Sequence, residues 1–268
     1  MKIAILGCGN MGLAYARSFL KYNLVSTENL LLIEKSAERA AQLAGMNIGK
    51  IAGSITNEIS EYDVVILSVK PQDFSVTEKE LSAVLTEKNL VLSIMAGKKI
   101  AYMSAALKHD NIVRAMPNSP AQLGMGITAY TAAEKVNPKQ LRMAENLLNS
   151  TGRSVYLEDE NLLDAVTALS GSGPAYFFYI VQQMTEAGVK LGIEPSVASM
   201  LVKQTMLGSF HLLNQATQTP EELIKAVASK GGTTEAAFNV FHQKHFGEIL
   251  QEAIAAAESR ARELSSVK

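Results

Sequence analysis

A short loop near residue 230 carries the residue types that bind a small anion. It reads Ser229-Lys230-Gly231-Gly232-Thr233-Thr234, and a helical pattern begins at about Glu235. Two adjacent glycines let the backbone approach a ligand closely and adopt unusual dihedral angles. The free backbone N–H groups at a helix start bind a carboxylate or a phosphate. We therefore expect the loop to hold an anionic small-molecule substrate beside a cofactor.

The N-terminal residues carry a dinucleotide-binding motif. Gly7-Cys8-Gly9-Asn10-Met11-Gly12 fits the pattern G-x-G-x-x-G, follows an apolar run that ends at Leu6 and opens a helical pattern. In this motif Gly7 forms the tight turn, Gly9 admits the pyrophosphate and Gly12 lets helix and strand pack closely. We predict that the segment from Leu6 to Gly12 binds the cofactor. Cys8 is expected to pack as a small apolar side chain and not to act as a nucleophile.

The residues after the second apolar run bear on the choice between NAD and NADP. Glu34 stands 22 positions after Gly12 and can bond a ribose 2′-hydroxyl, which favours NAD. Lys35, Ser36 and Arg39 can instead bind a 2′-phosphate, provided that Glu34 turns aside. We favour NADP, with NAD as the alternative.

Two later apolar runs end in residues that can complete the cofactor site. Ser68-Val69-Lys70-Pro71 ends one run, and Met95-Ala96-Gly97 ends the next. Ligands of open parallel sheets lie at the carboxyl ends of the strands. The small residues there would leave room for the ribose and the nicotinamide.

The pattern of apolar runs predicts an α/β domain followed by an all-helical domain. Strand-like runs cover 3–6, 30–33, 64–69, 90–95, 112–116, 127–132 and 154–157, and helical patterns cover 11–22, 36–44 and 138–150. Continuous apolar strands separated by helix-length segments indicate a parallel sheet covered on both faces. Helical spacing alone follows from about residue 162, over 175–191, 196–213, 221–228, 235–244 and 246–264. We predict a Rossmann-type, doubly wound domain over 1–160 and a helical domain over 161–268.

The composition excludes several classes of function. The chain has 268 residues, 47% hydrophobic and 19% charged, which is typical of a compact fold. The net charge of −1 gives no sign of the excess positive charge that binds nucleic acid or an anionic membrane. One cysteine and four histidines without ligand spacing indicate neither a disulfide framework nor a metal site. No apolar run is long enough to span a bilayer and no signal-peptide pattern opens the chain, so we expect a cytoplasmic protein.

Five motifs together resemble the pyrroline-5-carboxylate reductase family in order and spacing. Besides residues 7–12, 68–71 and 229–234, they are Arg114-Ala115-Met116-Pro117-Asn118-Ser119-Pro120-Ala121 and Leu169-Ser170-Gly171-Ser172-Gly173-Pro174-Ala175-Tyr176. The resemblance implies an NAD(P)H-dependent reduction of the ring C=N of 1-pyrroline-5-carboxylate to L-proline, the last step of proline biosynthesis. It also implies that the helical domain forms a homodimer, or a higher oligomer of dimers.

The resemblance further assigns roles to individual residues. Thr233 and Thr234 match positions that contact the substrate, together with Ser229, Gly231 and Gly232 of the same loop. Glu160 matches an acidic residue near the substrate, with Glu158 and Asp159 as neighbouring alternatives, and Asn57 matches an asparagine that contacts the cofactor. We assign the catalytic hydrogen bond to the ring nitrogen to the Thr234 hydroxyl. The alternative is a purely structural role, in which the two threonines only cap the following helix.

The chain departs from the family pattern at a few positions, and two other functions compete. Ser119 replaces a common threonine, Met95 replaces a small residue near the nicotinamide, and Glu34 is unusual among NADP-preferring members. One rival is a β-hydroxyacid dehydrogenase, whose catalytic lysine has no counterpart here, because Phe177 stands in that region and the next lysine is Lys190. The other rival is a non-catalytic nucleotide sensor, which has no need of a carboxylate-binding loop.

Overall fold

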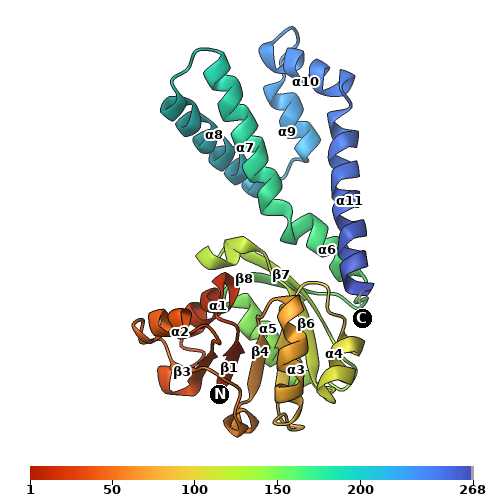
Figure 1. Ribbon diagram of the computed structural model, residues 1–268. Helices are drawn as coiled ribbons and strands as arrows, with labels where there is room; N and C mark the ends of the chain where they lie inside the picture. The colour runs from red at the N-terminus through yellow and green to blue at the C-terminus, as the bar shows by residue number, and fades with distance from the viewer. Residues whose placement is uncertain (267–268) are drawn as a thin grey trace. The chain divides into compact units, whose positions relative to one another are not determined.

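The computed structural model describes residues 1–266 and divides into two compact units (Figure 1). The first comprises residues 1–172 and the C-terminal segment that begins at Ala257, and the second comprises residues 173–256. The division into functional domains 1–160 and 161–268 stays a prediction.

The first unit is built on one eight-stranded sheet. Its strands are β1 (Ile3–Leu6), β2 (Leu30–Ile33), β3 (Lys50–Ala52), β4 (Val64–Leu67), β5 (Leu90–Ser93), β6 (Ile112–Met116), β7 (Gly126–Ala132) and β8 (Gly152–Tyr156). Their order is β3-β2-β1-β4-β5-β6-β7-β8, and every neighbouring pair is parallel except β6 and β7. Every residue of β1, β2, β4 and β5 is buried, which explains why these strands show no two-fold alternation. The predicted doubly wound sheet is confirmed.

Helices cover both faces of this sheet. They are α1 (Asn10–Lys21), α2 (Ala37–Ala44), α3 (Phe74–Ser82), α4 (Ile100–Leu107) and α5 (Pro138–Asn149). Ile3 and Ile5 of β1 pack in one apolar cluster with α1 and α5, and Ala4 and Leu6 pack in the other with α3 and α4. Successive side chains of β1 therefore point to opposite faces of the sheet and contribute to the apolar cores on both faces.

Strands β4 and β5 end two residues earlier than their apolar runs, and the short elements β3, α3 and α4 were not predicted. Strands β4 and β5 stop at Leu67 and Ser93, so the motifs at 68–71 and 95–97 lie in the loops that follow them. Strand β3 has three residues, begins at exposed Lys50 and pairs only with β2, which leaves little pattern to read. Helix α4 has Lys99 as its N-cap, which is not a capping residue type, so the local signal for a helix start is missing there. Helix α3 has Asp73 at its N-cap, a usual capping residue type, although its side chain makes no capping hydrogen bond.

The second unit consists of helices. They are α7 (Gly173–Lys190), α8 (Pro195–Gln215), α9 (Pro220–Val227), α10 (Thr233–Gln243) and the first part of α11 (Phe246–Ser266). Pro195 and Pro220 open their helices at the first position, as predicted. Before α7, the helix α6 (Leu162–Val166) runs into a π-helical turn at Thr167–Gly171, where the Ser172 N–H donates to the Thr167 carbonyl over 2.8 Å. Ser170 and Gly171 of the Ser-Gly-Ser-Gly motif thus lie in this wide turn.

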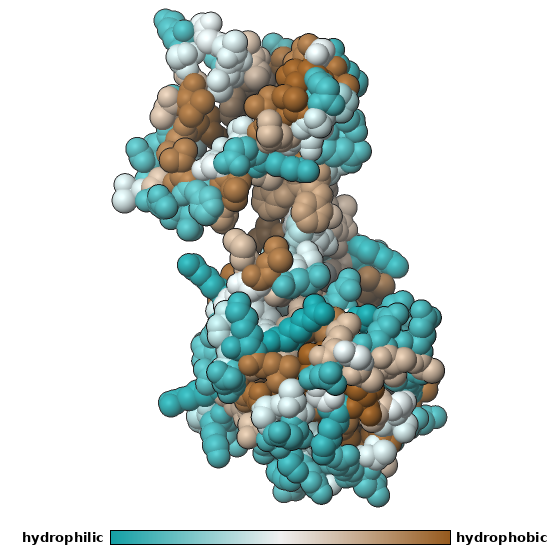
Figure 2. All heavy atoms as spheres, turned by 90° about the vertical axis from the view of Figure 1, so that its left-hand side faces the viewer, coloured by the Kyte–Doolittle hydropathy of each residue, from teal (hydrophilic) through white to brown (hydrophobic). Residues whose placement is uncertain are grey.

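The helical unit has almost no core of its own. Among residues 173–256 only Gly173 and Ala198 are buried. Large apolar side chains are exposed on every helix, including Phe178 of α7 and Met200 of α8. Figure 2 shows apolar residues gathered on the surface of these helices. In the part of the chain that the structure describes, no helix is both long and apolar enough to cross a membrane.

Candidate functional site

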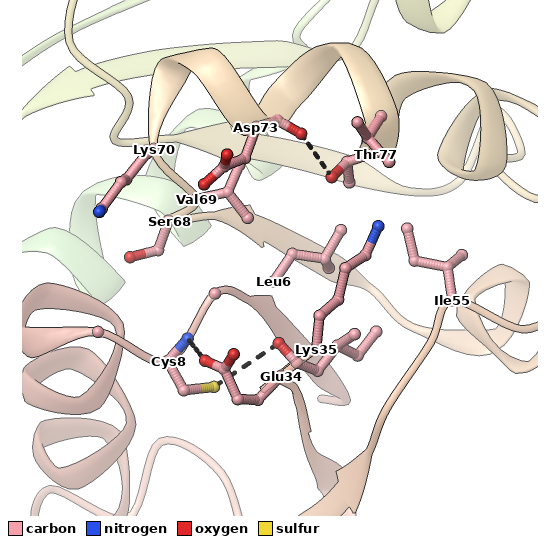
Figure 3. Close-up of a pocket in the computed structure, with 14 residues that line it drawn as sticks. Leu6, Cys8, Glu34, Lys35, Ile55, Ser68, Val69, Lys70, Asp73 and Thr77 are labelled. Atoms are coloured by element: carbon pink, nitrogen blue, oxygen red, sulfur yellow. Dashed lines mark hydrogen bonds between the residues drawn. The ribbon is translucent and has the colours of Figure 1, made fainter. Parts of the chain in front are cut away.

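A pocket of about 470 Å³ opens at the carboxyl ends of β1, β2 and β4. The predicted cofactor residues that line it are Leu6, Gly7, Cys8, Gly9, Lys35, Ser68, Val69 and Lys70, together with Glu34. Figure 3 shows Cys8 and Glu34 on one side of the pocket and Ser68 to Asp73 on the other. This is the place where an open parallel sheet binds a dinucleotide.

The three glycines of the motif have different surroundings. Gly7 has φ +87°, and a Cβ there would lie 2.7 Å from the Ser68 carbonyl oxygen. A Cβ on Gly12 would lie 2.3 Å from the Gly7 carbonyl oxygen, because α1 packs directly against the turn. A Cβ on Gly9 would meet nothing within 4 Å. Gly9 therefore leaves open space at the N-terminus of α1, as a pyrophosphate requires.

The Glu34 carboxylate is turned toward the backbone of the pocket wall. One of its oxygens accepts from the Cys8 N–H over 3.2 Å (Figure 3). The other accepts from the Ser36 N–H over 3.0 Å. Arg39 donates to the Cys8 carbonyl over 3.3 Å, so both sides of the Cys8 residue are held. Burial, reinforced by the charge of Glu34, raises the pKa of the Cys8 thiol to about 12. The thiol is therefore protonated at neutral pH and is no nucleophile, as predicted.

The remaining predicted cofactor residues lie outside the lining of this pocket. Three of them, Asn10, Met11 and Gly12, form the first turn of α1, and Ser36 caps α2 by accepting from the Arg39 N–H. The others are Asn57, Pro71, Met95, Ala96 and Gly97. Met95 is 2% exposed in the core that packs against α3 and α4, and Gly97 has φ +69° and lies against Leu264. The roles of these residues stay predictions.

Glu160 lies in a charged cluster of the first unit that sequence reasoning missed. Its Oε1 accepts from Arg114 of β6 over 2.9 Å and from the Ile100 N–H at the start of α4 over 2.7 Å. Arg114 also faces Asp164 over 3.4 Å, and the Ser265 hydroxyl donates to Asp164 over 2.7 Å. The Arg114 and Asp164 side chains are 3% and 5% exposed. The only signal in the sequence was a buried-strand arginine inside the motif 114–121.

The glycine-rich loop lies in the helical unit at the start of α10. Gly231 has φ +73°, and the Gly232 N–H donates to the Ser229 carbonyl over 2.9 Å, so the loop is a tight turn. Gly232 is the N-cap of α10, and neither threonine caps the helix with its side chain. The capping interpretation of Thr233 and Thr234 is therefore wrong. Thr234 is half-buried, and Thr233 is exposed.

Comparisons with known proteins agree with this architecture. Residues 160–264 match the family model described as "Pyrroline-5-carboxylate reductase dimerisation". Residues 2–97 match the family model described as "NADP oxidoreductase coenzyme F420-dependent". Pyrroline-5-carboxylate reductase of Pseudomonas aeruginosa is 38% identical over 98% of this chain and 97% of its own length. That of Haemophilus influenzae is 34% identical over 99% and 98%.

Solved structures show the same likeness in three dimensions. A pyrroline-5-carboxylate reductase from Coxiella burnetii has a TM-score of 0.88 at 31% identity and covers 99% of both chains. The pyrroline carboxylate reductase of Plasmodium falciparum, solved with NADP bound, has a TM-score of 0.88 at 26% identity and covers 99% of this chain and 98% of its own.

These findings confirm the predicted fold and reaction and set aside both rival functions. The space at Gly9 leaves room for a phosphate group, and the helical unit matches a dimerisation domain, which supports homo-oligomers. The chain belongs to the pyrroline-5-carboxylate reductase family and is an NAD(P)H-dependent oxidoreductase that reduces an imine in proline biosynthesis.

Proposed function

We propose that this chain reduces 1-pyrroline-5-carboxylate to L-proline with NADPH, held in the pocket at the ends of β1, β2 and β4. The observation that carries the proposal is the open space at Gly9, where a Cβ would meet nothing within 4 Å at the first turn of α1. Between the end of β1 and the first turn of α1, this space fits the pyrophosphate of a dinucleotide. The same loop is too tight for a side chain at Gly7 and Gly12, which shapes it for a phosphate.

Positioning accounts for most of the catalysis in this proposal. When bound, the reduced nicotinamide supplies a hydride to the imine carbon, and the ring nitrogen gains a proton, so that C=N becomes CH–NH. The N–H groups of the Gly231 to Thr234 loop hold the substrate carboxylate and fix one end of the ring. The Thr234 hydroxyl donates a hydrogen bond to the ring nitrogen. Because a hydroxyl is a poor acid at neutral pH, Thr234 orients the ring or relays a proton from water.

The preference for NADPH rests on the direction of Glu34. Both of its oxygens accept backbone N–H groups, which holds the carboxylate against the pocket wall and leaves it less able to bond a ribose 2′-hydroxyl. Lys35 lines the pocket, and its ion pair with Glu80 is long and half-exposed, with 3.7 Å between Nζ and Oε2. A 2′-phosphate at this corner would attract the Lys35 ammonium at little expense to the fold.

A cofactor comparison tests the reaction and the preference together. Purified protein is given 1-pyrroline-5-carboxylate with NADPH or with NADH, and oxidation of the nicotinamide is followed by its absorbance. We expect turnover with a higher kcat/KM for NADPH, and no turnover with either cofactor would refute the proposed reaction. Lys35→Ala should raise the KM for NADPH about three- to tenfold and leave NADH unchanged.

Lys50→Ala is the matched control for Lys35→Ala. Lys50 also forms an exposed ion pair, with Glu58 over 3.5 Å, but lies outside the pocket. It should leave both KM values unchanged. Equal or better use of NADH by the wild-type protein would contradict the cofactor preference alone. Assembly into oligomers of dimers and a cytoplasmic location stay predictions from the family resemblance and from the sequence.

A further inference from the structure

The carboxylate of Glu235 accepts a hydrogen bond from a backbone N–H of the loop that we propose binds the substrate carboxylate. The Gly231 N–H donates to Glu235 Oε2 over 2.6 Å. Glu235 is the third residue of α10 and is half-buried. A negatively charged oxygen at this distance forms a charge-assisted hydrogen bond, which is stronger than a neutral one. The chain therefore places a carboxylate of its own where the proposed function requires that of the substrate.

The neighbouring helix shows that this contact differs from ordinary helix capping. In α9, Glu222 at the third position accepts from the N–H of the N-cap Thr219 over 2.8 Å, which forms a capping box. In α10 the N–H of the N-cap Gly232 donates to the Ser229 carbonyl instead. Glu235 reaches one residue further back, to Gly231, where φ is +73°. Its carboxylate is thus bonded to a residue of the tight turn itself and not to the N-cap.

We propose that Glu235 is an internal competitor of the substrate, a side chain that holds the Gly231 N–H until the substrate carboxylate displaces it. This inference rests on the proposed function of the loop. One N–H cannot donate fully to two carboxylates, and two negative charges at one site repel each other. Binding therefore requires Glu235 to leave, and the apparent affinity falls by the fraction of molecules in which the loop is free.

Removing the Glu235 carboxylate should change the KM for 1-pyrroline-5-carboxylate. The direction of the change shows whether Glu235 competes with the substrate or only stabilises the loop. If Glu235 competes, its removal makes the loop available in more molecules, and the KM for 1-pyrroline-5-carboxylate falls. If Glu235 only keeps the loop in shape, its removal loosens the turn, and the same KM rises. The step of hydride transfer does not involve Glu235 in either case, so kcat is expected to stay within about twofold.

The experiment uses Glu235→Gln and Glu235→Ala in the full chain. We expect the KM for 1-pyrroline-5-carboxylate to fall about three- to tenfold, with the KM for NADPH unchanged. Glu235→Gln keeps the size of the side chain and a neutral acceptor, so it should show the smaller decrease. Glu222→Gln is the matched control, because it makes the same change at the same position of α9, and should leave KM at the wild-type value.

Binding of the product gives a second readout that does not depend on turnover. Calorimetry of L-proline binding in the presence of NADP⁺ should show, for each Glu235 variant, a Kd lowered by the same factor as its KM. A raised KM, or a KM equal to that of Glu222→Gln, would overturn the competition. A wild-type protein that fails to reduce the substrate would refute the proposed function instead, and the two failures are therefore distinguishable.

Discussion

At the scale of single residues, the glycines of the phosphate loop differ in what they make room for. Gly9 has φ −69°, which any residue adopts, and faces open space, whereas a Cβ on Gly12 would lie 2.3 Å from a backbone oxygen. Gly9→Ala should keep the fold and raise the KM for NADPH about tenfold or more, because the methyl group enters the pyrophosphate space. Gly12→Ala should destabilise the protein by roughly 1–3 kcal/mol.

Thermal unfolding and cofactor titration of the two variants separate these roles. The Tm of Gly9→Ala should stay near that of the wild type, and the Tm of Gly12→Ala should fall by several degrees. If Gly9→Ala bound NADPH normally, the pyrophosphate would lie elsewhere.

The two threonines of the substrate loop offer a second residue-scale prediction. Thr234→Ala should lower kcat/KM roughly 10²–10⁴-fold, because the hydrogen bond to the ring nitrogen is lost at the reacting bond. Thr233→Ala should have the smaller effect, since Thr233 is exposed and Thr234 is half-buried. Steady-state kinetics of both variants measure the difference. The reverse order of the two losses would show that Thr233 serves the ring nitrogen.

Local residue patterns could be read from the sequence, and contacts between distant residues could not. The roles of Gly7, Gly9 and Gly12 follow from a six-residue spacing. The short distances that a Cβ would make at Gly7 and Gly12 agree with a tight turn and close packing, and the pyrophosphate role of Gly9 stays a prediction. The turn of Glu34 toward Cys8 depends on a backbone 26 positions away in the chain, which β1 and β2 bring together. The Glu235 contact is local, but a glutamate after two threonines looks like a standard capping residue.

At the scale of elements, Arg114 joins β6 to α6 and to the end of α11. Its side chain is 3% exposed and faces Glu160 and Asp164, and Asp164 also accepts from Ser265 of α11. Arg114→Met would leave two carboxylates without their buried partner, so we expect a loss of about 3–5 kcal/mol in the free energy of unfolding. Urea denaturation measures it.

An exposed ion pair provides the comparison for Arg114→Met. Lys135 pairs with Asp110 over 2.7 Å, and both side chains are exposed to water. Lys135→Met should leave the urea midpoint almost unchanged, because water screens such a pair. Similar midpoints for the two variants would show that the buried cluster does not stabilise the fold.

The apolar strands could be predicted from the sequence, whereas helix α4, which depends on Glu160 of the Arg114 cluster, could not. Strands such as β1 and β4 are apolar throughout and are bounded by turns, so their position was read correctly within two residues. Helix α4 was missed because its first N–H is satisfied by Glu160, which lies 60 residues further along the chain. A helix that is capped from a distance leaves no capping residue in its own sequence.

At the scale of the whole molecule, the helical unit is incomplete as a single copy. Among residues 173–256 only Gly173 and Ala198 are buried, while Phe178 is 69% exposed and Leu191 is 83% exposed. A unit of this size without a core is not stable alone, and contiguous apolar surface of this kind marks an interface. The match to a dimerisation domain gives the partner as a second copy of the chain.

Because the partner supplies the missing core, stability should depend on protein concentration. The midpoint of thermal unfolding is expected to rise with concentration, since a dimer unfolds into two chains. Phe178→Asp would place a charge among the exposed apolar side chains of α7 and should shift the protein toward single chains with weaker helical circular dichroism. Analytical ultracentrifugation measures the mass of both proteins. A single-chain mass for the wild type, with a midpoint independent of concentration, would mean that the exposed helices α7 and α8 do not need a second copy.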